Sequence, residues 1–222
     1  GPGKEALTRV GEREPVPPEA AELADALIKG DKEAARGVLA DAHRQEGYLG
    51  MAAGWVAPAL RRVGELWQER KISVADEHLA TAHAQRLLTE QFTRSDFRPP
   101  GDDHRALFAC VPTNQHEVGL RVLADSFELA GWRVEFLGAD TPIASLIDRV
   151  ERFRPEVVGL SVSLARQIPR LKAVVEALRE AFGEDCPRLV AGGPGLQGLP
   201  DLPSQLGLDA CYAQPQDALK EL

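Results

Sequence analysis

The chain has 222 residues, 44% of them hydrophobic and 27% charged, with a formal net charge of −8 at pH 7. This composition is typical of a globular protein with room for two small domains, and its acidity disfavours direct nucleic-acid binding. The three scattered cysteines, the missing signal peptide and the missing long apolar run predict a cytoplasmic protein that neither forms a disulfide scaffold nor enters a membrane.

Residues 1–17 are polar and proline-rich at their end, and they predict a flexible lead-in that begins with a tag remnant. Residues 18–96 carry apolar side chains at helical spacing. We expect helices at about residues 18–29, 31–43, 47–69 and 73–92. Gly30 ends the first helix, and Ser73 with Asp76 predicts a capping box at the start of the fourth. This segment therefore predicts a four-helix bundle.

Residues 97–104 contain two prolines and a glycine, and they predict a linker. In residues 105–222, short apolar runs alternate with helical patterns. We expect strands at about residues 106–111, 133–137, 157–162, 188–191 and 210–213, and helices at about 117–130, 144–153, 167–182, 203–206 and 215–222. The predicted fold class is α/β, with the bundle followed by a Rossmann- or flavodoxin-like, doubly wound, five-stranded parallel sheet. Ligands of such sheets bind beyond the carboxyl ends of the strands.

His116 follows the first predicted strand, at this ligand-binding edge. Imidazole is a good ligand for a transition metal, although a single loop histidine is more often an ordinary surface residue. Two further motifs stand at fixed distances from it. Residues 120–160, 41 positions, separate the segment Asn114–Gly119 from Ser161-Val162-Ser163, and residues 164–191, 28 positions, separate that motif from Gly192-Gly193.

This pattern resembles the signature of cobalamin-binding domains, D-x-H-x-x-G, about 41 residues, S-x-L, about 26 to 28 residues, and G-G. The resemblance implies that cobalamin (vitamin B12) binds with its dimethylbenzimidazole tail detached from cobalt and buried in the α/β domain. It implies that His116 is the lower axial ligand to cobalt and that Ser161 donates a hydrogen bond to the tail. Gly192 and Gly193 would let the nucleotide loop pass close to the backbone.

Two positions depart from that signature. Asn114 replaces an acidic residue that binds the far nitrogen of the ligand histidine, and because an amide carries no charge we expect a weaker bond from His116 to cobalt. Ser163 replaces leucine, so we expect a slightly different wall of the tail slot. The segment Asp140–Pro142 resembles a D-T-P motif near the corrin edge, where we expect Thr141 to cap the next helix and proline to be its first residue.

Trp67 and the pair Glu77-His78 form a second pattern, W-x9-E-H. Taken singly, such residues are usually a core anchor and a polar surface. Beside the cobalamin motifs, they resemble the pattern of B12-dependent photoreceptors of the CarH and LitR type. The resemblance implies that the bundle caps the upper corrin face and that these three residues hold a 5′-deoxyadenosyl group, which light releases to shift the cap. Gln68 stands where the best-known members carry a cobalt-capturing histidine.

Three functions remain open. The first is a light sensor that has no catalytic residues and signals through a protein partner or a homo-oligomer. The second is a corrinoid methyl carrier, and the third is a light-independent cobalamin-binding regulator. An indole above cobalt would block the in-line access that methyl transfer needs, which favours the sensor. We expect adenosylcobalamin as the cofactor, with methylcobalamin and hydroxocobalamin as alternatives.

Overall fold

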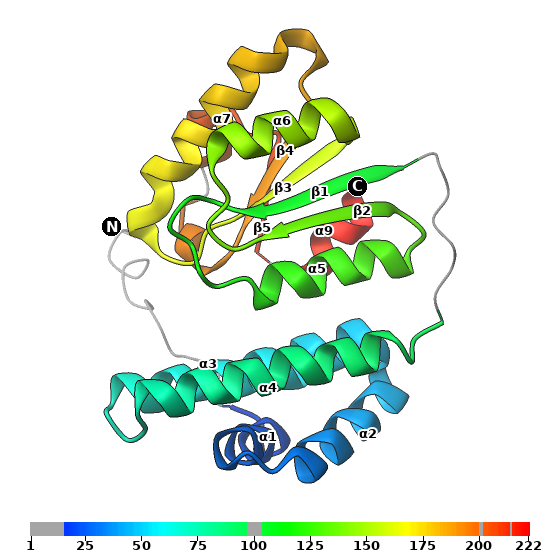
Figure 1. The fold of residues 1–222 in the computed structure, drawn as a ribbon, viewed down its shortest axis with the longest axis vertical. Helices are drawn as coiled ribbons and strands as arrows, with labels where there is room; N and C mark the ends of the chain where they lie inside the picture. Colours follow the sequence, from blue (N-terminus) through cyan, green and yellow to red (C-terminus); the bar gives the residue numbers. More distant parts are fainter. Residues whose placement is uncertain (1–15, 97–103, 200–201, 214) are drawn as a thin grey trace, which may run out of the picture. The chain divides into compact units, whose positions relative to one another are not determined.

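The computed structural model describes residues 16–96, 104–199, 202–213 and 215–222. The predicted lead-in at residues 1–17 and the linker at 97–104 lie almost entirely outside these ranges. The chain divides into a helical unit that extends to Leu87 and an α/β unit that begins at Leu88 (Figure 1). Within the described ranges, no helix is both long and apolar enough to cross a membrane.

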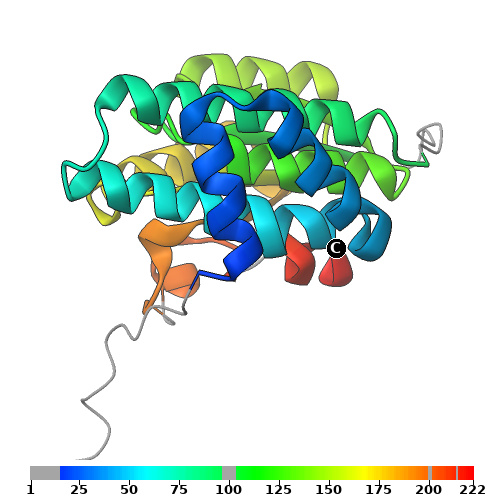
Figure 2. The same cartoon turned by 90° about the horizontal axis from the view of Figure 1, so that it is seen from below.

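Four α-helices, as predicted, build the described part of the helical unit, and the last of them, α4, continues past Leu87. They are α1 Pro18–Lys29, α2 Lys32–Met51, α3 Ala57–Gln68 and α4 Val74–Phe92, and a π-helical turn, η1, spans Ala52–Val56. Figure 2 shows α1, in blue, crossing α3, and these two helices pack against each other. Leu23, Leu27, Leu39, Met51 and Val63 are among the fully buried side chains of this unit.

Glycines and a polar side chain set the limits of the first two helices. Gly30 ends α1 with φ 71°, a left-handed conformation that is cheap for glycine. Asp31 caps α2 by accepting a hydrogen bond from the Ala34 N–H at 3.0 Å. The predicted start of a separate helix near residue 47 agrees with a kink inside α2. Gly47 has a non-helical backbone there, with φ 71° and ψ 179°, so that the range Lys32–Met51 joins two helices.

Five parallel strands form one sheet in the order β2-β1-β3-β4-β5. The strands are β1 Arg105–Cys110, β2 Arg133–Gly138, β3 Val157–Ser161, β4 Arg188–Gly192 and β5 Ala210–Tyr212. The helices are α5 Val118–Leu129, α6 Ile143–Phe153, α7 Ile168–Phe182, α8 Leu202–Leu206 and α9 Pro215–Glu221. The predicted α/β class is confirmed, and each of these elements lies within one residue of its expected bounds.

Helices cover both faces of the sheet (Figure 1). Successive strand residues point to opposite faces. Leu107 and Ala109 join a core with α6 and α7, whereas Ala106 and Phe108 join a second core with α5. Because both faces are buried, the central strands are continuously apolar in sequence.

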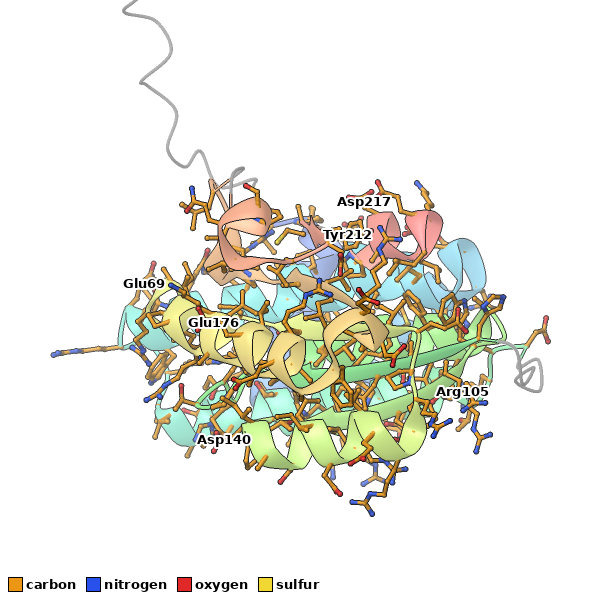
Figure 3. The ribbon with its side chains drawn as sticks, turned by 90° about the horizontal axis from the view of Figure 1, so that it is seen from above. Glu69, Arg105, Asp140, Glu176, Tyr212 and Asp217 are labelled. Atoms are coloured by element: carbon orange, nitrogen blue, oxygen red, sulfur yellow. The ribbon has the colours of Figure 1, made fainter. Side chains whose placement is uncertain are left out.

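The strand order places the topological switch point between β1 and β3. In a doubly wound sheet, a crevice opens at this point beyond the carboxyl ends of the two strands. Cys110 at the end of β1 pairs with Ser161 at the end of β3. Figure 3 labels Asp140 at the carboxyl edge and Arg105 at the opposite edge. The loops that carry the predicted cobalamin motifs therefore meet at one edge of the sheet.

Candidate cofactor-binding site

His116 lies in the loop between β1 and α5, and it is exposed. Its backbone N–H donates to Asn114 Oδ1 at 3.1 Å, and its carbonyl accepts a hydrogen bond from the Cys110 thiol at 3.7 Å. The backbone of His116 is therefore anchored to the end of β1, while the residue remains open to a ligand.

Asn114 is fully buried beneath this loop, with 0% of its surface exposed. Its Nδ2 donates to the carbonyl of Ser161 at 3.0 Å and lies 3.5 Å from the Ser161 hydroxyl. Its Oδ1 accepts a hydrogen bond from the backbone N–H of His116. An amide provides both a donor and an acceptor, which an ionised carboxylate cannot do. The asparagine at this position thus joins the His116 loop to the end of β3.

Thr113 and Asp140 adopt left-handed backbone conformations, with φ 73° and 46°. Such a φ is uncommon for a β-branched residue and persists only where neighbouring groups hold it. The Thr113 N–H donates to Asp140 Oδ1 at 2.6 Å, and the Asp140 N–H donates to the Asn114 carbonyl at 2.9 Å. These two bonds join the loop after β2 to the loop after β1.

Gln167 is a residue of the site that no sequence motif indicated. It is 3% exposed and ends a short 3-10 turn, η2, at Ala165–Gln167. Its Oε1 accepts from the N–H groups of Ser163 and Leu164 at 3.1 and 3.0 Å, and its Nε2 donates to the Thr113 carbonyl at 3.1 Å. A glutamine three residues after the start of a turn is a signal for the first two bonds. The third depends on the fold.

Thr141 does not have the predicted capping role. Its hydroxyl donates to the Gly138 carbonyl at 3.2 Å, and its N–H donates to the Cys110 carbonyl at 3.3 Å. Helix α6 begins at Ile143, and Pro142 occupies the N-cap position with an extended conformation. The expected cap was therefore wrong by one position, and Thr141 closes the turn after β2 instead.

Ser161 and the paired glycines lie at the ends of β3 and β4. Ser161 is 9% exposed. A Cβ on Gly193, which has φ 117°, would lie 2.3 Å from the Val162 carbonyl oxygen, and one on Gly192 would lie 2.9 Å from the Tyr212 carbonyl oxygen. The protein's own backbone therefore requires glycine at both positions.

Gly119 and Ser163 complete the predicted set in this unit. Gly119 lies in the first turn of α5, and a Cβ there would meet no atom within 4 Å among the described residues. Ser163 is half-buried, and its N–H is bound by Gln167. The space around Gly119 leaves that edge of the loop open.

The Cys110 thiol is neutral at physiological pH. Burial, followed by the Glu117 carboxylate, raises the pKa of Cys110 to about 12, although its hydrogen bond with Ser161 acts in the opposite direction. A neutral thiol is a poor metal ligand. In the described part of the chain, no three histidine, cysteine or acidic side chains are grouped to hold a metal ion.

The predicted capping box at the start of α4 is confirmed. The Ser73 hydroxyl and N–H donate to Asp76 Oδ2 at 2.7 and 2.8 Å, and the Asp76 N–H donates to the Ser73 hydroxyl at 3.2 Å. These hydrogen bonds from Ser73 lower the pKa of Asp76 from its usual range. The cap fixes where the first turns of α4 begin.

Trp67 lies on α3, and Glu77 and His78 lie on α4, the next helix in the chain. Trp67 is 45% exposed. Glu77 Oε2 lies 2.6 Å from His78 Nδ1, and Glu77 Oε1 accepts from the Thr81 hydroxyl at 3.0 Å. The predicted pattern therefore places an exposed indole on α3 and a hydrogen-bonded Glu–His pair on α4.

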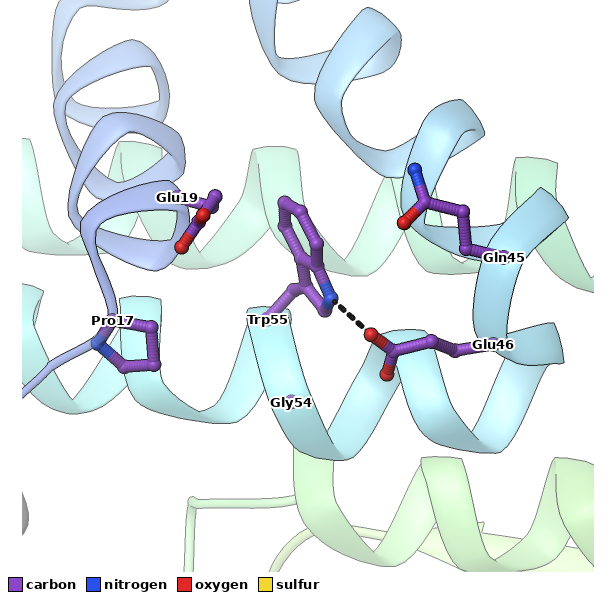
Figure 4. A pocket seen from close by; sticks show the side chains of 6 residues that line it. All are labelled: Pro17, Glu19, Gln45, Glu46, Gly54 and Trp55. Atoms are coloured by element: carbon purple, nitrogen blue, oxygen red, sulfur yellow. Dashed lines mark hydrogen bonds between the residues drawn. The ribbon is translucent and has the colours of Figure 1, made fainter.

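A separate pocket of about 360 Å³ lies within the helical unit (Figure 4). Its lining residues are Pro17, Glu19, Gln45, Glu46, Gly54 and Trp55. Trp55 Nε1 donates to Glu46 Oε1 at 3.3 Å. A Cβ on Gly50 would lie 2.7 Å from Glu46 Cβ, so glycine there makes room for this side chain. None of the predicted cofactor residues lines the pocket.

The α/β fold places a ligand site at the carboxyl edge of the sheet, and the family matches make the chain a cobalamin-binding protein. The chain belongs to the B12 binding domain family, whose model matches residues 104–222, and a second model described as a B12 binding domain matches residues 19–90. These matches support cobalamin as the cofactor.

Relatives place the chain more closely. It is 36% identical over 166 residues to the HTH-type transcriptional repressor CarA of Myxococcus xanthus, an alignment that covers 75% of this chain and 54% of CarA. It is 32% identical over 137 residues to CarH of the same organism, covering 62% and 45%. The predicted relationship to the CarH type is thus confirmed, and the chain spans about half the length of these relatives.

Corrinoid proteins match over a larger share of their length. Dimethylamine corrinoid protein 1 of Methanosarcina acetivorans is 26% identical over 206 residues, which is 87% of this chain and 90% of that protein. The structure of the Methanosarcina barkeri monomethylamine corrinoid protein has a TM-score of 0.71 at 16% identity and covers 89% of this chain and 93% of that one. This likeness supports the fold, a helical region followed by a Rossmann-like domain.

Proposed function

We propose that this chain is a cobalamin-dependent light sensor that uses adenosylcobalamin. The family matches support the cofactor class. The similarity to CarA and CarH, which are named as transcriptional repressors, supports a regulatory role. When bound, adenosylcobalamin supplies a cobalt–carbon bond that visible light breaks.

In this proposal the α/β unit holds the cofactor from its lower side. His116 ligates cobalt, and Ser161 donates a hydrogen bond to the detached tail. Asp140 and Thr141 lie near the corrin edge. The exposure of His116, above a buried Asn114 that anchors its backbone, supports this assignment.

The exposed Trp67 is the observation that carries the light-sensing proposal. A tryptophan normally buries most of its large apolar surface, and 45% exposure leaves a face available for another ring. The Glu77–His78 pair offers polar atoms for the hydroxyl groups of a sugar. An aromatic face together with hydrogen-bonding groups suits a nucleoside, so we propose that these three residues contact the adenosyl group.

Loss of the adenosyl group would leave Trp67 without its packing partner. The helical unit would then change its contacts, and the signal would pass to a protein partner or to a second copy of the chain. Gln68 follows Trp67 and provides no imidazole. We therefore expect no bis-imidazole adduct through position 68 in the illuminated protein, where water or, after a shift, His78 would fill the site.

Absorbance spectra before and after green light test the proposal. The protein is loaded with adenosylcobalamin in the dark, illuminated, and filtered to recover any released nucleoside. We expect a lasting spectral change and a nucleoside product. Trp67→Ala should weaken adenosylcobalamin binding and leave hydroxocobalamin binding nearly unchanged, whereas Trp55→Ala, which removes the same side chain from the same unit, should affect neither. A dark-loaded protein that light leaves unchanged would contradict the proposal.

A second experiment tests the lower ligand. His116→Ala should abolish the absorption spectrum of imidazole-ligated cobalamin. His104→Ala is a matched control because His104 is exposed and precedes β1, at the opposite edge of the sheet. Retention of the imidazole-ligated spectrum in His116→Ala would refute the assignment.

A corrinoid methyl carrier is the second candidate. It is favoured by the alignment with dimethylamine corrinoid protein 1, which covers 90% of that protein. A carrier should exchange methyl groups with a methyltransferase when loaded with methylcobalamin, and Trp67→Ala should speed that exchange by opening the upper face. Methyl transfer by the unaltered chain, together with an absent light response, would establish this alternative.

A further inference from the structure

We propose that Gln167 is a positioning residue that keeps the His116 loop in its ligand-binding conformation. The inference rests on the proposed role of His116 as cobalt ligand. Gln167 belongs to the turn after β3 and not to the loop that carries the histidine. Any effect of Gln167 on His116 must therefore pass through the contacts between these two loops.

The carboxamide of Gln167 joins the two loops on both sides of the switch point. Its oxygen accepts two backbone N–H groups of the β3 loop, from Ser163 and Leu164, and its nitrogen donates to Thr113 of the β1 loop. Gln167 itself is buried, with 3% exposed, and the three bonds are partly buried. Methionine has a similar shape but no donor and only a weakly accepting sulfur, so Gln167→Met removes these hydrogen bonds while nearly keeping the volume.

Thr113 explains why the bond across the loops matters. Its backbone is held at φ 73°, three positions before His116. Two side chains from different loops bind the backbone of Thr113. Asp140, after β2, accepts a hydrogen bond from its N–H, and Gln167, after β3, donates one to its carbonyl. A threonine released on one side would relax toward a negative φ. That rotation would redirect the chain into Asn114 and His116.

The first test uses the protein without cofactor and therefore does not depend on cobalamin binding. Amide hydrogen exchange is compared by NMR in wild type, Gln167→Met and Gln167→Glu. The Met variant should lose protection at Ser163, Leu164 and Thr113. The Glu variant keeps an acceptor and should retain protection at Ser163 and Leu164. The Thr113 N–H donates to Asp140 and not to Gln167, so in both variants its protection should fall only because the Thr113 backbone rotates away from Asp140. Gln205→Met, an exposed position on α8, is the matched control and should change none of them.

The second test measures the effect on the metal ligand. Each variant is titrated with hydroxocobalamin, and the imidazole-ligated fraction is read from absorbance. Loss of one buried hydrogen bond and relaxation of Thr113 should weaken binding by about tenfold and reduce the imidazole-ligated fraction. The Glu variant should show the same spectral defect, because it also lacks the donor to Thr113. A residue needed only for folding would lower stability without changing the spectrum of the bound fraction.

A double-mutant cycle with Thr113→Gly completes the argument. Glycine adopts φ 73° without strain, so the effect of Gln167→Glu on affinity should be smaller in the Thr113→Gly background. The Glu variant also covers the case in which Gln167→Met fails to fold. Unchanged exchange at Thr113, or unchanged affinity and spectrum in a folded Gln167→Glu protein, would overturn the inference. A wild type that binds no cobalamin would instead refute the proposed function, while the exchange data would still report on the loops.

Discussion

Replacing Asn114 by aspartate is the sharpest test of the buried amide beneath His116. In Asn114→Asp, a carboxylate oxygen takes the place of Nδ2 and faces the Ser161 carbonyl oxygen, which lies 3.0 Å from that nitrogen. The Ser161 carbonyl keeps the hydrogen bond from the Val111 N–H. The main penalty is therefore the repulsion between two oxygens and the burial of a charge at a position with 0% exposure.

The cost depends on pH because protonation restores a donor. Burial and the facing carbonyl should raise the pKa of the new carboxyl above its unfolded value of about 3.9. At lower pH both states carry the proton, and the variant should resemble wild type. As pH rises, the unfolded chain ionises first, so stability falls until pH reaches the raised folded pKa. An increase of about two pKa units corresponds to about 2.7 kcal/mol lost at neutral pH.

Urea unfolding of the cofactor-free protein at pH 5 and pH 8 measures this loss. We expect Asn114→Asp to be less stable than wild type by about 2 to 3 kcal/mol at pH 8, with a smaller difference at pH 5. Gln115→Glu is the control, since it makes the same chemical change at an exposed neighbouring position and should shift stability by less than about 0.5 kcal/mol. Equal stability of Asn114→Asp and wild type at pH 8 would refute the donor role of the amide.

Three further predictions follow from other contacts. Gly193→Ala should destabilise the α/β unit by roughly 3 kcal/mol or more in urea unfolding, because its Cβ would overlap a carbonyl oxygen at φ 117°, whereas Gly119→Ala, in open space, should be near neutral. Ser73→Ala should raise the pKa of Asp76 in an NMR titration, because the Ser73 hydrogen bonds lower that pKa in the wild type. The lowered pKa stabilises the folded state at pH values above the pKa of Asp76 in the unfolded chain, and this stabilisation is lost as pH falls through the folded pKa. An unchanged Asp76 titration in Ser73→Ala would contradict the prediction. Cys110 should react with iodoacetamide far more slowly at pH 8 than in urea, because its pKa is about 12, and equal rates by mass spectrometry would count against its burial.

The sequence predicts the α/β unit well because both faces of its sheet are buried. Continuous apolar runs such as 157–162 then have one plausible structure, and glycine or proline marks the ends. The helical unit was less predictable at its centre. Gly47 indicates a break, but the π-helical turn at Ala52–Val56 arises from packing and has no pattern of its own in the sequence.

The candidate site also contains residues that the sequence predicted and contacts that it did not. His116, Ser161 and the glycine pair were predicted because their spacing resembles a family signature. The contacts of Asn114 and Gln167 were not, since they reach Ser161 and Thr113 across 47 and 54 positions of the chain. Such bonds follow only from the register of β1 against β3. An amide at a loop position is compatible with exposure or with burial until that register is known.

The two amides beneath the site have a practical consequence for measurements on this protein. Neither Asn114 nor Gln167 gains or loses a proton in water, and a neutral hydrogen bond is hardly screened by dissolved ions. The bonds that they make between β1 and β3 should therefore stay constant across buffers of different acidity and ionic strength. A measurement of cofactor affinity at several pH values would then not be complicated by a rearrangement of these two supporting contacts.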